Sequence, residues 1–125
     1  MVNALIDTSV VVDLLRQYPS AEHWFAAQGQ LGVSRAVWLE VLEGAENKRK
    51  QQHALKILRR FEPIEIVPED VVWSINQLLV LGLSHNIDAF DCLIAASSQR
   101  LQLPLFTRNM KHFVPLIGSL AQQPF

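Results

Sequence analysis

Three carboxylates lie inside otherwise apolar stretches of this chain. Asp7 ends an apolar run that begins at Ala4, Glu40 lies within Ala36–Leu42, and Asp91 stands beside a third such run. An ionised acid in an apolar setting is unfavourable by several kcal/mol unless it is paired, or else its pKa rises until it is neutral. Three such placements require a compensating cation, and a divalent metal ion is the simplest candidate.

The types of the available donors indicate which metal this is. The chain has a single cysteine, Cys92, and four scattered histidines, so it offers no Cys/His cluster at zinc spacing. Mg²⁺ and Mn²⁺ are hard cations that prefer carboxylate oxygens and retained waters. The sequence therefore favours Mg²⁺ or Mn²⁺ over zinc.

The elements that must position these acids alternate between strands and helices. The spacing of apolar residues predicts the strands and helices, and Pro and Gly residues mark where they end. The expected strands are 2–6, 31–34, 64–67 and 103–107, and the expected helices are 10–17, 20–28, a region from 35 kinked near Gly44 and Asn47, 48–60, 68–81 and 88–101. Residues beyond this last strand carry no clear pattern.

This alternation predicts an α/β domain with a mostly parallel sheet covered on both faces. In such sheets functional sites lie beyond the carboxyl ends of the strands. Asp7 follows the first expected strand, and Thr107, Arg108 and Asn109 end or follow the last one. We expect the site at this edge of the sheet.

Four sequence motifs, in order, resemble those of PIN-domain proteins, and VapC-like toxins match best. The motifs are Leu5–Ser9, Ser34 followed by Glu40 and Glu43-Gly44, Asp91–Ala96, and Thr107–Phe113. The resemblance implies a three-layer α/β/α sandwich around a four- to five-stranded parallel sheet, formed by residues 1–125 as a single domain. It also implies a divalent-metal-dependent endoribonuclease, a small VapB-like antitoxin partner and a homodimer.

The residues divide into roles under this hypothesis. Asp7 and Asp91 hold the metal, with Glu40 as a third ligand directly or through water. The metal polarises the scissile phosphate and lowers the pKa of a bound water, so no side-chain nucleophile is needed. Ser9 and Thr107 are expected to hydrogen-bond the carboxylates or the phosphate.

The last of the four motifs, Thr107–Phe113, departs from the family pattern. Asn109 stands where many relatives have an acid, and His112 stands where another aspartate is often found. An amide can ligate or orient but adds no negative charge, so we expect one tightly held ion, with Asn109 as a fourth catalytic residue. Asp88 is an alternative source of the missing charge, although Asp88 and Asp91 also fit a capping box at a helix start.

The remaining charged residues receive more ordinary interpretations. Asp13 is expected to pair with Arg16 or Gln17 at the surface and is left out of the site. Arg108 and Lys111 flank Asn109 and are the first candidates for contact with RNA. The clusters Lys48–Lys50 and Arg59-Arg60 fit a solvated helix face better.

Composition limits the other possibilities. The chain has 125 residues, half of them hydrophobic, and a net charge of −1, which suits one domain without a global positive field. The N-terminus does not read as a signal peptide and no apolar stretch is long enough to span a membrane, so a cytoplasmic protein without membrane contact is expected.

Other functional classes fit poorly or remain open. A haloacid-dehalogenase phosphatase needs an acid where Ser9 stands, and the turn after Asp7 lacks the glycines of a dinucleotide-binding motif or P-loop. Two alternatives within the same family stay open. One is a housekeeping RNA-processing nuclease, and the other is a weakened PIN domain that acts only as a binding partner.

Overall fold

A five-stranded, all-parallel sheet forms the centre of the molecule. A computed structural model describes residues 1–125. The strands lie in the order β3-β2-β1-β4-β5, which places β1 in the middle and β3 and β5 at the edges. The expected α/β fold with a parallel sheet of four to five strands is confirmed.

Each parallel pair needs a crossover connection, and helices supply all of them. Along the chain the elements are β1 (Ala4–Ile6), α1 (Thr8–Leu15), α2 (Pro19–Ala26), β2 (Leu31–Ser34), α3 (Arg35–Glu43), α4 (Lys48–Leu58), β3 (Glu62–Ile64), α5 (Pro68–Gln77), η1 (Leu78–Gly82), α6 (Leu83–His85), α7 (Ala89–Leu101), β4 (Leu105–Phe106), α8 (Met110–Ile117), η2 (Gly118–Leu120) and β5 (Ala121–Gln122).

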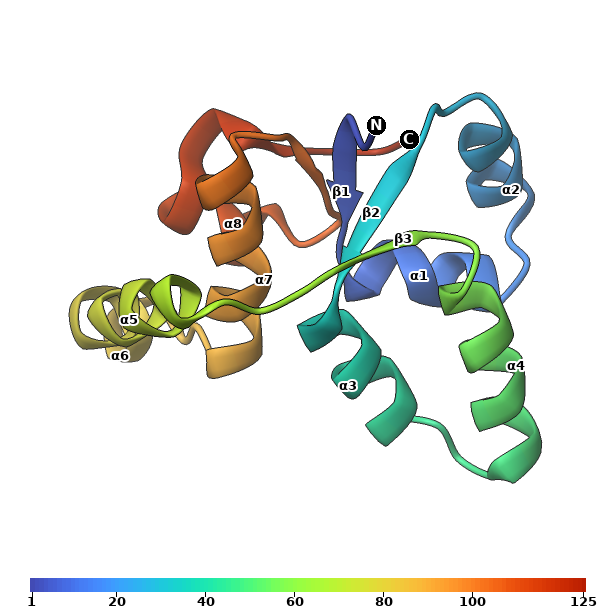
Figure 1. The fold of residues 1–125 in the computed structure, drawn as a ribbon, viewed down its shortest axis with the longest axis horizontal. Helices are drawn as coiled ribbons and strands as arrows, with labels where there is room; N and C mark the ends of the chain where they lie inside the picture. The colour runs from blue at the N-terminus through green and yellow to red at the C-terminus, as the bar shows by residue number, and fades with distance from the viewer.

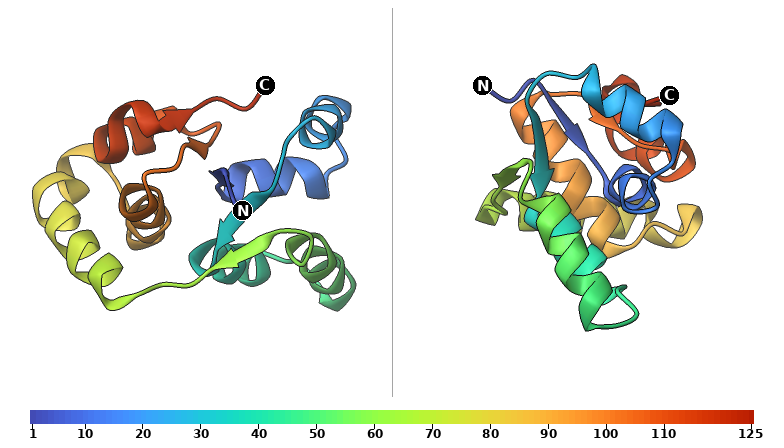
Figure 2. Two further views of the ribbon diagram at one scale, coloured as in Figure 1. Left: turned by 45° about the horizontal axis from the view of Figure 1, so that its top comes forward. Right: turned by 90° about the vertical axis from the view of Figure 1, so that its right-hand side faces the viewer.

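The helices form two layers around the sheet. Helices α1, α2 and α4 gather on one side, and α7 and α8 lie on the other, with α5 outside α7 (Figures 1 and 2). All three residues of β1 are buried, and the core continues through Cys92, Ile94 and Phe113. The expected three-layer sandwich is therefore present.

Side-chain caps start the helices that follow the strands. Asp7 caps α1, Ser34 caps α3 and Asp88 caps α7, each accepting a hydrogen bond from a backbone N–H of the first turn. Gly44 ends α3 and the Asn47 side chain caps α4, so the expected kinked region consists of two helices. These caps fix the position of the strand ends relative to the helices.

The third strand lies earlier than expected. It spans Glu62–Ile64, not 64–67, and pairs Pro63 with Val33 and Ile64 with Ser34. The expected range followed the apolar residues, whereas the actual strand includes a proline. Proline is tolerated there because β3 is an edge strand, where one backbone N–H has no partner to bond.

The helical region after Pro68 is longer than expected. It was predicted to end near Leu81, with a polar turn after Gly82, but the chain stays helical through η1 and α6 to His85. Gly82 has ordinary helical angles, and the region ends at Asn86, which has a left-handed φ of 53°. Asparagine adopts this conformation more readily than most residues, which explains the stop.

The last strand has no counterpart in the sequence prediction. Ala121 and Gln122 pair with Leu105 and Phe106 of β4, and the Gln122 carbonyl accepts the Thr107 N–H at 2.9 Å. No helix in the structure is long and apolar enough to cross a membrane.

Candidate active site

Asp7 lies at the carboxyl end of the central strand, and its two carboxylate oxygens are held separately. Oδ1 accepts hydrogen bonds from Ser9 Oγ at 2.6 Å and from the Val10 N–H at 3.3 Å. Oδ2 accepts from Thr107 Oγ1 at 2.6 Å. The side chain is buried, and this burial raises its pKa although the hydrogen bonds oppose the shift.

The segment that follows β4 holds the two hydroxyl groups that bind Asp7. The Arg108 N–H donates to Ser9 Oγ at 3.0 Å, and the Asn109 N–H donates to Thr107 Oγ1 at 2.9 Å. Both hydroxyls that hold Asp7 are thus held in turn by backbone groups of this segment. Ser9 and Thr107 contact the carboxylate as expected.

Asp91 and Asp88 lie at the start of α7 and cap it together. The Asp91 N–H donates to Asp88 Oδ1 at 2.8 Å, and the Asp88 N–H donates to Asp91 Oδ2 at 3.4 Å. Burial and the negative charge of Asp88 raise the pKa of Asp91 to about 6, and Glu40 contributes in the same direction. The capping interpretation of Asp88 is confirmed, and the same geometry keeps its charge beside Asp91.

Glu40 reaches the site from α3. It is partly buried, and its Oε1 accepts a hydrogen bond from Thr8 Oγ1 at 2.5 Å. Thr8 had no role in the sequence prediction, although its place directly after Asp7 was a usable signal. Since the charge of Glu40 raises the pKa of Asp91, the acids from α3 and α7 lie within electrostatic reach of each other.

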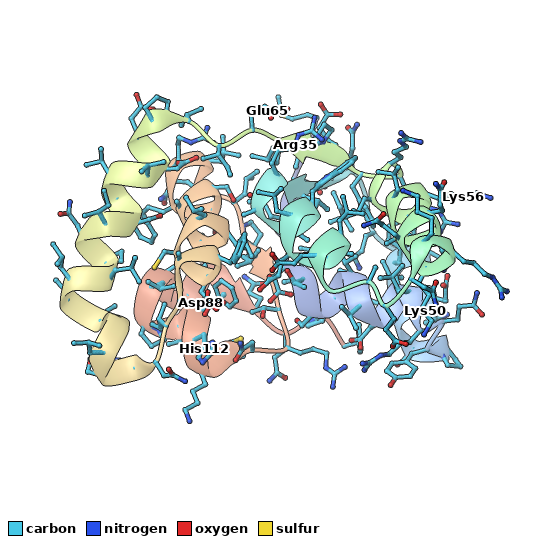
Figure 3. The ribbon with its side chains drawn as sticks, turned by 90° about the horizontal axis from the view of Figure 1, so that it is seen from below. Arg35, Lys50, Lys56, Glu65, Asp88 and His112 are labelled. Atoms are coloured by element: carbon cyan, nitrogen blue, oxygen red, sulfur yellow. The ribbon has the colours of Figure 1, made fainter.

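Asn109 and His112 complete this edge of the sheet. His112 Nδ1 lies 3.0 Å from Asp91 Oδ2 and 3.0 Å from the Asn109 side-chain nitrogen. With Nδ1 protonated the ring donates to Asp91, and with Nδ1 bare it accepts from Asn109. Asp88 and His112 lie close together at the ends of neighbouring helices (Figure 3). The Asn109 amide is therefore directed to His112.

Asp13 is not the surface residue that the sequence predicted. It is 1% exposed, and its Oδ1 accepts from Arg108 Nη1 at 2.6 Å, across 95 positions of sequence. The predicted pairing with Arg16 or Gln17 is wrong, because the Asp13 side chain points toward the segment after β4. Arg108 is therefore tied to α1, whereas Lys111 is exposed and has no acidic partner.

The donors at this edge fit a hard divalent cation by their chemistry. Asp7, Glu40, Asp88 and Asp91 offer only oxygen atoms, and after burial the charges of Asp88 and Glu40 add to the rise in the pKa of Asp91. No three His, Cys, Asp or Glu side chains already converge at metal-binding distances.

A hollow of about 490 Å³ opens beside the acids, between α1, α3 and α4. Thr8 and Glu40 line it on the side of the site, and Lys50 and His53 line it on the side of α4. Its floor includes the apolar side chains of Val12, Leu15, Val41 and Ala54.

The chain is similar in sequence to PIN-domain proteins. The model of the PIN domain matches residues 4–113. Ribonuclease VapC1 of Methanocaldococcus jannaschii is 28% identical over 113 residues, which cover 87% of this chain and 77% of that protein.

Solved structures extend the likeness to the fold. A toxin-antitoxin complex from Klebsiella pneumoniae contains a chain with 28% identity and a TM-score of 0.77, with 98% of each chain covered. A DNA-bound VapBC from Salmonella typhimurium has a TM-score of 0.78 at 16% identity, with both chains fully covered, which shows the same fold.

Proposed function

The chain belongs to the PIN-domain family, and we propose that it is a divalent-metal-dependent endoribonuclease, the toxin of a toxin–antitoxin pair. The observation that carries the proposal is that two buried carboxylates are fixed at helix starts beside the sheet, Asp7 by Ser9 and Thr107 and Asp91 by Asp88 and His112. The names of the relatives, a ribonuclease and a toxin-antitoxin complex, support the same activity and partner.

Asp7, Asp91 and Glu40 hold Mg²⁺ or Mn²⁺ in this proposal. The ion supplies Lewis-acid polarisation of the scissile phosphate and a water of lowered pKa. Ser9 and Thr107 keep the Asp7 carboxylate in a fixed orientation through their 2.6 Å hydrogen bonds. Asn109 acts through His112, whose Nδ1 it shares with Asp91.

An RNA cleavage assay tests the function. The purified protein should cleave members of a broad RNA panel with Mg²⁺ or Mn²⁺, and EDTA should stop the reaction. Asp7→Asn and Asp91→Asn should each lower the rate at least about 100-fold, which corresponds to roughly 3 kcal/mol of lost transition-state stabilisation.

Two glutamates of α3 form a matched pair for the same assay. Glu40→Gln should lower the rate, whereas Glu43→Gln should leave it unchanged, because Glu43 is exposed and makes no ion pair. Cleavage that persists in EDTA, or no cleavage of any RNA, would contradict the enzyme and leave only a binding role.

We propose an antitoxin protein as partner and a cytoplasmic location, where cellular RNA is the substrate. Expression of the chain alone should arrest growth, and co-expression of a neighbouring antitoxin should relieve the arrest. A housekeeping nuclease would not arrest growth in this way.

A homodimer is the proposed assembly, and an exposed apolar stripe supports it. Val72, Ile75, Leu79 and Leu83 recur at helical spacing along α5, η1 and α6, and each is more than half exposed. Large contiguous apolar surfaces of this kind typically mark protein interfaces.

A further inference from the structure

The positive charge of this chain is concentrated in one short segment. Residues 48–60 contain six of its 11 Lys and Arg residues and no Asp or Glu. All six basic side chains are exposed. Because the whole chain carries −1, the rest of the molecule carries −7, so α4 and the two residues that follow Leu58 are a basic ridge on an acidic protein.

Almost none of this charge is neutralised within the fold. Of the six basic residues only Lys50 has an acidic partner, Glu46 at 3.1 Å, and both side chains are largely exposed. Elsewhere Arg35, Arg100 and Arg108 are all paired with carboxylates. The ridge therefore presents free cations, whereas three of the four arginines outside it are held in ion pairs, Arg16 being the exception.

The ridge also opposes the local rules of helix stability. Lys48, Arg49 and Lys50 occupy the first three positions of α4, where the helix dipole disfavours positive charge by about 0.3–1 kcal/mol for each residue. No acid lies in that first turn to offset them. A locally unfavourable pattern whose only structural gain is one exposed ion pair, Lys50 with Glu46, indicates a functional demand.

The ridge is continuous with the active site. Lys50 and His53 line the same hollow as Thr8 and Glu40, and His53 also lines the next hollow along α4, with Lys56 and Arg59. Arg49, His53 and Lys56 lie on one face of α4 at helical spacing. Lys50 and Lys56 both project from this helix on the side of the molecule away from α5 (Figure 3).

We propose that this ridge binds the phosphate backbone of the RNA substrate and leads it into the carboxylate site. The proposal rests on the proposed ribonuclease function. From Lys48 to Leu58 the helical part of the ridge is about 15 Å long at 1.5 Å per residue, enough to contact several phosphates of one strand. Without a bound metal the acids at the site repel phosphate, so the ridge is the adjacent source of positive charge that can hold the RNA.

An acidic protein is the other partner that such charge fits, and the surface disfavours it. Protein interfaces have an apolar centre with charged residues at the rim. Within residues 48–60 every exposed side chain is polar and the apolar ones are buried or half-buried, so contact along the ridge is polar, and the apolar floor of the hollow lies only at its end beside Glu40. Such a surface suits salt-dependent contact with phosphates.

RNA affinity measured without cleavage tests the ridge. Fluorescence anisotropy with a labelled 20-nucleotide RNA in EDTA compares the wild type, a neutral triple variant (Arg49→Gln, Lys56→Gln, Arg60→Gln) and a charge-keeping control (Arg49→Lys, Lys56→Arg, Arg60→Lys). At low salt the neutral variant should bind at least 10-fold more weakly, and its log–log salt slope should be about 2 units shallower, whereas the control should match the wild type.

Thermal melting separates this role from a structural one. Removing Arg49 from the first turn relieves repulsion with the helix dipole, and removing Lys56 from the last turn loses a favourable interaction of similar size, so the neutral variant should melt close to the wild type. Weaker RNA binding without lower stability is a result that a structural role cannot produce.

The failures of the two proposals differ. If the wild type cleaves RNA but the neutral variant binds RNA with unchanged affinity and slope, the ridge proposal is wrong and the enzyme stands. If in addition the neutral variant loses its complex with a co-expressed antitoxin, the ridge is a protein interface. If the wild type cleaves no RNA with either metal, the proposed function fails, and a wild type that binds no RNA in EDTA overturns the ridge as well.

Discussion

The stability of the fold and the proposed metal binding favour different protonation states of Asp91. Its pKa is raised from the ordinary 3.8 to about 6 by burial and by Asp88, so the folded state holds a proton there more tightly than the unfolded chain. This contribution to stability is fully present below about pH 4 and is lost as the pH rises through about 6. At neutral pH the ionised carboxylate destabilises the metal-free fold, while the proposed metal requires this same form.

Asp91→Asn should therefore stabilise the metal-free protein at pH 7.5 by roughly 1–3 kcal/mol, less the lost pairing with His112. The gain should vanish near pH 4, where Asp91 of the wild type is protonated. Thermal melts in EDTA at the two pH values measure this. Added Mn²⁺ should raise the melting temperature of the wild type more than that of the variant, and an equal rise would contradict the role of Asp91 as a ligand.

Local sequence context identified some acids of the site and failed for another. Asp7 and Asp91 could be predicted because each follows or flanks an apolar run and starts a helix, and Glu40 because it interrupts such a run. Asp13 has a similar apolar context, yet its partner is Arg108, a contact that no local pattern reveals. The roles proposed for Asp7, Glu40 and Asp91 remain predictions for the cleavage assay.

The packing of strand β2 between its neighbours requires a glycine at position 32. A Cβ added at Gly32 would lie 2.9 Å from Leu5 Cδ2 and 3.0 Å from the Ile64 side chain, both packed in or against the core. Gly32→Ala should lower the free energy of unfolding by about 1–3 kcal/mol, as overpacking commonly does. Chemical denaturation measures the change.

Gly44 supplies the control for this prediction. It ends α3 with a helical φ of −78°, and its nearest neighbour to an added Cβ is the Glu40 carbonyl oxygen at 3.4 Å. Gly44→Ala should be neutral or slightly stabilising, because alanine restricts the unfolded chain. An equal loss of stability in both variants would show that Gly32 has no special packing role.

Capping residues made the starts of the helices predictable, whereas the positions of two strands depend on pairing with distant segments. Ser34 and Asp88 carry their helix-start signals in the sequence itself. The position of β3 could not be predicted in the same way, because it depends on pairing with Gly32–Ser34, and strand β5 is only two residues long. Short strands whose partners are distant leave little pattern in a sequence.

The whole molecule exposes one apolar stripe along α5, η1 and α6, where we propose that two copies meet. Leu79 and Leu83 are 81% and 102% exposed. Leu79→Glu should shift the protein from dimer to monomer in sedimentation velocity, because a charge would be buried at the centre of the contact. Leu101→Glu, an exposed apolar position on α7, should leave the dimer intact. A monomeric wild type would contradict the assembly.

The pairing of β5 with β4 has a consequence for the order in which the molecule is made. Thr107, whose hydroxyl orients Asp7, has its own N–H held by the Gln122 carbonyl, so the position of Thr107 in the site depends on residues 121–122. Domains fold during synthesis from the N-terminus onward, and here Asp7, Glu40 and Asp91 all leave the ribosome before that strand does. While the chain is being made, its acids are therefore present before the hydrogen bond that holds Thr107 can form. The site is complete only after the segment that contains β5 has left the ribosome.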